Sequence, residues 1–149
     1  MLYLLLKWLH ILLAIIAVGA NITYGVWIAR AERSPEVLPF VLRGIKFLDN
    51  RIANPAYGLL LVTGLAMVLV SGIPLTTPWI SLSLVLYVAA IAMGIFIFTP
   101  LSRRRLELVE GGGHGSEEYR ALARKERVLA AVLAVLVVTI VFLMVVKPR

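Results

Sequence analysis

The sequence contains no cysteine. This absence excludes disulfide bonds, thiolate metal sites and the covalent attachment of a c-type haem. Acidic residues are also scarce, and none of the eight lies inside a long apolar run, which argues against a proton pump built on membrane carboxylates. The sequence has no phosphate-binding loop, dinucleotide fingerprint, HExxH motif or nucleophile elbow, so it indicates no enzyme class.

What the chain has in excess is hydrophobicity. Apolar residues make up 61% of its 149 residues, against about 45–50% in a soluble domain. Four apolar runs, each close to the ~20 residues that cross a bilayer core, occupy residues 2–29, 52–71, 79–100 and 128–146. They predict an all-α, polytopic membrane protein: an antiparallel four-helix transmembrane bundle that forms a single domain over residues 1–149.

The basic residues predict the orientation in the membrane. Twelve of the fifteen Lys and Arg residues lie in the connections 30–51 and 101–127, and none lies in the link 72–78. The positive-inside rule places both basic connections in the cytoplasm and both termini outside the cell (inner) membrane. The net charge of +7 is therefore a sign of topology and does not indicate nucleic acid. The run Arg103, Arg104 and Arg105 is a candidate contact for anionic lipids.

Two helix starts are expected within the basic connections. Ser34-Pro35-Glu36 combines a cap residue, a proline and an acid, so 34–48 is either an interfacial amphipathic helix or an extension of span two. A bend is expected at Asn54-Pro55, because proline removes a backbone donor. Ser116, followed by two glutamates, predicts a second helix that continues to Val146.

The polar and small residues of the first span share one stripe. At heptad-like spacing the stripe consists of Tyr3, Lys7, His10, Ala14, Ala17, Asn21 and Tyr24. Similar stripes are Asn54, Gly58, Leu61 and Gly64 on span two, and Trp79, Ser83, Tyr87, Ala90 and Gly94 on span three. We expect the three stripes to meet, with Asn21, Tyr24 and Tyr87 lining a pocket near His10.

His10 is the ionisable side chain expected deep in the membrane, nearer the outer leaflet than Asn21. It is interpreted either as a neutral histidine that hydrogen-bonds a tyrosine or carbonyl of a neighbouring helix, or as an axial haem ligand or proton relay. Asn21 is interpreted as an interhelical hydrogen-bonding residue, or alternatively as a substrate-polarising group. His114 lies in the loop Gly111–Gly115, where one histidine cannot make a metal site, so no metal site is predicted.

Two motifs carry a resemblance to known proteins. Trp8-Leu9-His10-Ile11 with Gly19, and Asn54-Pro55-Ala56-Tyr57-Gly58 followed by Thr63-Gly64-Leu65, resemble an uncharacterised family of small bacterial predicted integral membrane proteins. More distantly, they are similar to CopD-like and HemJ-type four-helix membrane proteins. The resemblance implies a four-helix membrane bundle and, as in some members of the group, a haem-binding histidine on the first helix, which corresponds to His10.

Three functional hypotheses follow. The first is a small haem-binding or redox-associated membrane protein with His10 as ligand, for which a symmetric dimer would bring two copies of His10 together. The second is a non-catalytic membrane bundle in which His10 and Asn21 join helices. The third is a small-solute or ion pathway along the stripes.

Overall fold

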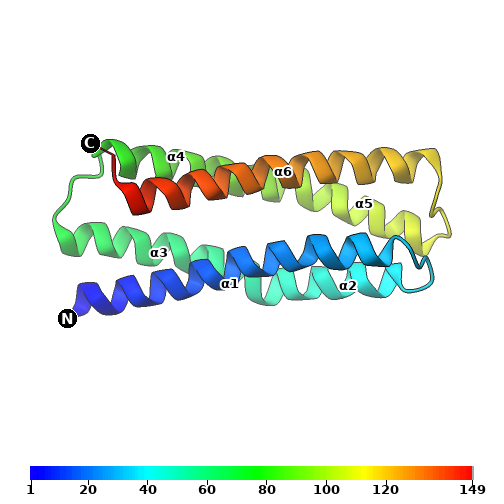
Figure 1. Ribbon diagram of the computed structural model, residues 1–149, viewed down its shortest axis with the longest axis horizontal. Helices are drawn as coiled ribbons and strands as arrows, with labels where there is room; N and C mark the ends of the chain where they lie inside the picture. The colour runs from blue at the N-terminus through cyan, green and yellow to red at the C-terminus, as the bar shows by residue number, and fades with distance from the viewer. Residues whose placement is uncertain (149) are drawn as a thin grey trace. The chain divides into compact units, whose positions relative to one another are not determined.

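The computed structural model describes residues 1–148, and over them it consists of helices, turns and short loops without a strand. The elements, in order, are α1 (Leu2–Ala31), α2 (Leu38–Leu48), the π-helical turn η1 (Asp49–Ala53), α3 (Asn54–Ser71), α4 (Pro78–Met93), the π-helical turn η2 (Gly94–Phe98), α5 (Thr99–Glu110) and α6 (Glu117–Val146) (Figure 1). The predicted all-α class is confirmed.

Within residues 1–148, four continuous helical segments are long and apolar enough to cross a membrane. They are Leu2–Ala31, Leu38–Ser71, Pro78–Glu110 and Glu117–Val146. A helix of 30 residues measures about 45 Å, so each exceeds a hydrocarbon core of about 30 Å. The polytopic membrane class is therefore confirmed, and segment 34–48 is settled from Leu38 onward as an extension of span two. The same is true of span three, which continues beyond Pro100 to Glu110.

The chain divides into two compact units, Met1–Pro74 and the part from Leu75 onward. In the first unit α1 packs against α3, and in the second α4 packs against α6. Both pairs are antiparallel, because an early residue of one helix contacts a late residue of the other: His10 contacts Thr63, and Trp79 contacts Lys147. Each unit is thus a helical hairpin.

The two predicted helix starts have different outcomes. Ser116 has an extended backbone, and its hydroxyl accepts a hydrogen bond from the N–H of Tyr119 at 3.1 Å, so this cap is confirmed. The start at Ser34-Pro35-Glu36 is wrong, because these residues form a turn and α2 begins at Leu38. Pro39 fits the first helical turn at no cost in hydrogen bonds, and Leu38 is fully buried there.

Both long composite helices accommodate a proline through a π-helical turn. Pro55 and Pro100 are the second residues of α3 and α5, immediately after η1 and η2. The N–H of Asn54 donates to the carbonyl of Asp49, and that of Thr99 to the carbonyl of Gly94. Each bond spans five residues, as in a π-helix. The proline expected to bend span two therefore lies in a helix that continues through it.

The core of the first unit is small and apolar. Leu13 and Ala17 of α1 pack against Ala56 and Leu60 of α3. Ala17 is fully buried, and its small side chain lets the two helices approach closely. The predicted face of span two is partly wrong, because Gly58 is exposed and has nothing within 4 Å of a Cβ position. Ala56, Tyr57 and Leu60, which lie one or two positions away, face α1 instead.

In the second unit, the predicted stripe of span three faces α6 at its first turns. Ser83 is 1% exposed, and Trp79 lies under the ammonium group of Lys147 at 5.5 Å. Outside these contacts the helices expose large apolar side chains, such as Val85 on α4 and Val145 on α6. Such surfaces suit lipid rather than water.

Candidate functional site: a polar seam between α1 and α3

His10 makes a specific polar contact across the first hairpin. Its Nδ1 atom lies 2.8 Å from the hydroxyl oxygen of Thr63 on α3. Thr63 is 5% exposed, whereas His10 is half-buried. The predicted partner is a tyrosine or a carbonyl; the structure also places the hydroxyl of Thr63 within hydrogen-bond distance, because α3 turns this residue toward α1.

The hydrogen bonds of Thr63 favour one tautomer of the His10 ring. The Thr63 hydroxyl donates its one hydrogen to the carbonyl of Leu59 at 2.8 Å. A hydroxyl has a single hydrogen to give; when that hydrogen goes to Leu59, the Thr63 oxygen accepts toward His10 and Nδ1 carries the proton. In neutral imidazole the other nitrogen, Nε2, then carries the lone pair. A ring held by an Nδ1–H bond is the usual arrangement of a ligating histidine.

Gly64 provides the room for this ring. A Cβ built on Gly64 would lie 3.2 Å from Cε1 of His10, which is inside ordinary van der Waals contact. A larger residue at this position would push the imidazole away from Thr63.

Gly64→Ala is therefore expected to weaken the His10–Thr63 hydrogen bond and to be less stable than Gly58→Ala by about 1 kcal/mol, the net value of one such bond. Gly58→Ala is the matched control, because it lies on the same helix with open space around its Cβ position. Thermal unfolding in detergent micelles compares the two. Equal melting temperatures for both variants would contradict close contact at Gly64.

Asn21 and Tyr57 form the second polar contact of the seam. The Asn21 amide nitrogen donates to the Tyr57 hydroxyl at 2.5 Å and to the Ala17 carbonyl at 2.9 Å. One turn further along α1, Tyr24 is 8% exposed, and its buried hydroxyl has no hydrogen-bond partner. His10, Asn21 and Tyr24 therefore share one seam on α1, as the stripe predicts.

Tyr87, the fourth predicted pocket residue, belongs to the second unit. It lies half-buried on α4, the helix that packs against α6. The two polar pairs of the seam described above are formed within the first unit alone. The pocket shared by all four residues remains a prediction.

The second unit has a buried ionic cluster that the sequence analysis missed. Arg105 on α5 is 3% exposed and pairs with Glu126 on α6 at 2.5 Å. The same guanidinium donates to the Tyr119 hydroxyl at 2.9 Å and lies 5.1 Å from the centre of its ring. The sequence feature that could have indicated this cluster is the position of Glu126 among the basic residues that precede span four.

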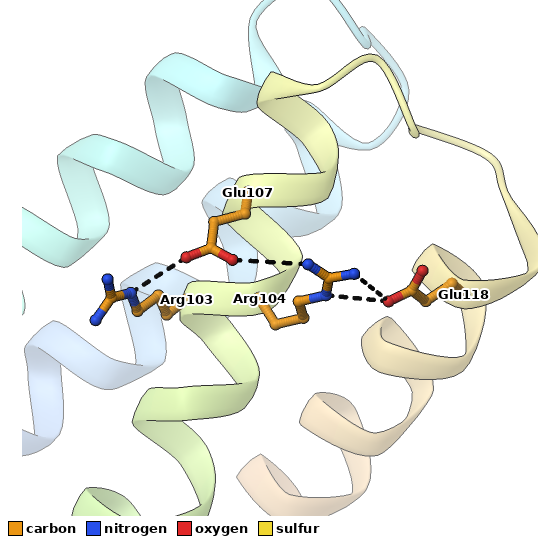
Figure 2. Close-up of polar contacts among 4 residues, drawn as sticks. All are labelled: Arg103, Arg104, Glu107 and Glu118. Atoms are coloured by element: carbon orange, nitrogen blue, oxygen red, sulfur yellow. Dashed lines mark hydrogen bonds and ion pairs between the residues drawn. The ribbon is translucent and has the colours of Figure 1, made fainter.

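The neighbours of Arg105 also have acidic partners (Figure 2). Arg103 contacts Glu107 at 3.2 Å, and Arg104 contacts Glu118 at 3.0 Å and Glu107 at 3.8 Å. The three arginines thus pair with carboxylates of the chain itself. These ion pairs weaken the electrostatic basis of the anionic-lipid contact, which stays a prediction.

The hairpins and the seam together define an integral, multi-pass membrane protein whose polar side chains pair between helices and whose apolar side chains face outward. The family comparison agrees. The chain belongs to the family of predicted integral membrane proteins described as DUF2269, whose model matches residues 4–148. No curated protein and no solved structure matches the chain. The predicted membership in an uncharacterised membrane family is confirmed, and the more distant similarity to CopD-like and HemJ-type proteins stays a prediction.

Proposed function

We propose that the chain is a haem-binding, redox-associated membrane protein in which His10 would ligate the haem iron. One observation carries the proposal: Nδ1 of His10 lies 2.8 Å from the hydroxyl oxygen of Thr63, and a Thr63 hydroxyl that donates to the Leu59 carbonyl would hold the His10 proton on Nδ1. This tautomer leaves the Nε2 lone pair for an iron centre.

The residues present suit haem better than a bare metal ion. The described residues contain no group of three or more His, Cys, Asp or Glu side chains that could hold a metal, whereas haem needs one protein ligand at minimum. Haem supplies one-electron redox chemistry when it is bound. The chain's own contribution is to orient the ring: Thr63 favours one tautomer, and Gly64 admits it next to α3.

The absorption spectrum tests the proposal. Protein purified from a haem-sufficient host is expected to show a Soret band, and His10→Ala is expected to abolish it. His114→Ala is the matched control, because His114 lies in the 111–116 loop of the other unit and the band should survive its loss. A colourless wild-type protein would overturn the proposal, and so would a band of full strength in the His10→Ala variant.

The second candidate function is a non-catalytic membrane bundle. It is supported by the fact that His10 and Asn21 both have partners on α3, at 2.8 Å and 2.5 Å. Under this alternative the protein is colourless, and the His10→Ala variant differs only by a lower melting temperature.

We further propose that the loops 32–37 and 111–116 face the cytoplasm of the inner membrane, and that both termini face outward. Because the sequence has no cysteine, single cysteines can report the topology without background. Thr76→Cys in the short link is expected to react with an impermeant maleimide in intact cells. Gly112→Cys is expected to react only after permeabilisation. The reverse pattern would invert the proposed orientation.

A further inference from the structure

Asp49, the first residue of the π-helical turn η1, is a carboxylate without a basic partner among residues 1–148. Its one observed hydrogen bond, from the amide of Asn54, is long at 3.5 Å and therefore weak. The nearest arginine in sequence, Arg51, lies over the ring of Phe47 instead. Asp49 is half-buried, and a partly desolvated anion is costly unless something compensates its charge.

Two tyrosine hydroxyls accompany this carboxylate. α1, which carries Tyr24, packs against η1, and Tyr57 lies in the first turn of α3, directly after η1. The Tyr24 side chain is more than nine-tenths buried, and its hydroxyl has no partner. A buried hydroxyl without a hydrogen bond is rare in native structures and calls for an unobserved ligand, ion or water.

The backbone contributes further oxygen atoms. Pro55 has no N–H, so one carbonyl of the preceding π-helical turn has no main-chain donor. The side-chain oxygen of Asn50 lies at the same turn, 3.4 Å from the Asn54 amide. Broken helices in membrane proteins use such released carbonyls to coordinate small cations.

We propose that Asp49, Tyr24, Tyr57 and the one carbonyl of η1 without a main-chain donor form a binding site for a monovalent alkali cation of the Na⁺ or K⁺ class. A single carboxylate among neutral oxygens matches one positive charge, whereas Ca²⁺ sites commonly gather several acidic ligands. Oxygen ligands favour hard cations over copper or zinc. The cation would supply the counter-charge that Asp49 lacks and would occupy the unpartnered Tyr24 hydroxyl. The site is separate from His10 and does not rest on haem binding.

Thermal unfolding of the full chain in detergent micelles tests the proposal. Choline chloride at constant ionic strength is replaced stepwise by NaCl, and in a second series by KCl. One or both metal ions are expected to raise the melting temperature saturably, by roughly 2–4 °C. The series with the lower half-saturating concentration identifies the preferred ion.

Variants localise the effect. Asp49→Asn keeps the shape of the side chain and is expected to raise the half-saturating concentration at least about tenfold. Tyr24→Phe removes only the unpartnered hydroxyl and is expected to weaken the shift. Glu36→Gln makes an equal change of charge in the exposed turn before α2 and should leave the ion-dependent rise in melting temperature intact. Identical melting temperatures in choline, Na⁺ and K⁺ would overturn the proposal, as would an unchanged shift in Asp49→Asn, or a shift that follows pH and not the metal ion.

Discussion

Replacing Arg105 with methionine is expected to destabilise the protein by about 3–5 kcal/mol, the cost of leaving one member of a buried ion pair without its partner. Methionine fills most of the volume of the arginine stem, so the lost charge dominates the effect. Glu126 would remain 6% exposed, and its Oε1 atom already lacks a hydrogen-bond partner. Thermal unfolding in micelles should show a melting temperature lower by roughly 6–20 °C.

Two comparisons separate this effect from a general loss of charge. Arg103→Met removes the neighbouring ion pair, whose side chains are 71% and 49% exposed, and exposed pairs one helical turn apart contribute only about 0.3–0.5 kcal/mol. The double variant Arg105→Met with Glu126→Leu removes both buried charges and should regain most of the stability. If Arg105→Met melted at the temperature of Arg103→Met, the buried pair would not hold α5 and α6 together.

Replacing Thr63 with valine has the second large expected effect. Valine keeps the shape of threonine but can neither accept from His10 nor donate to Leu59. The Nδ1–H of His10, which is half-buried, would lose its acceptor, which costs up to about 1–3 kcal/mol. If His10 ligates haem as proposed, loss of this orienting bond should also lower haem affinity about 10–100-fold. Thermal unfolding and haem titration measure the two effects independently.

Thr139→Val is the matched control for this substitution. The Thr139 hydroxyl bonds only the carbonyl of Val135 within its own helix, at 2.8 Å. Its loss is therefore expected to change stability by less than about 0.5 kcal/mol. Equal effects at Thr63 and Thr139 would show that the contact across the hairpin contributes nothing beyond a local backbone bond.

The spans could be predicted from the sequence because hydrophobicity sums over the many residues of each run. Runs of about 20 apolar residues and a clear asymmetry of Lys and Arg locate four helices without any knowledge of packing. The ends of the helices were harder to predict from the sequence. Ser34 is of a residue type that often caps helices, but α2 begins at Leu38, because this side chain is buried in the folded protein. At Ser116, with Glu117 and Glu118 in the first turn, local preference and structure agree.

The site was predictable on one helix and not on its partner. A stripe of polar and small residues in an otherwise apolar span indicates the inward face of α1, and His10, Asn21 and Tyr24 lie there together. On α3 the expected face was displaced from Gly58 to Thr63 and its neighbours, since span two has too few polar residues to fix its rotation. The pair Arg105–Glu126 was missed because sequence spacing cannot show which charges meet across a loop.

The π-helical turns have a consequence for how this chain compares with its homologues. A π-turn contains one residue more than an α-turn. The side chains before η1 are therefore rotated, relative to those after it, by about 100° from where a continuous α-helix with the same number of residues would place them. Each turn therefore has the form of a single-residue insertion into an α-helix. Deleting one residue within Asp49–Ala53 is therefore expected to convert the turn to α-helix and to leave Leu38 and Leu42 facing α1, where they are now buried. We expect family members that lack Pro55 or Pro100 to be one residue shorter at the same place.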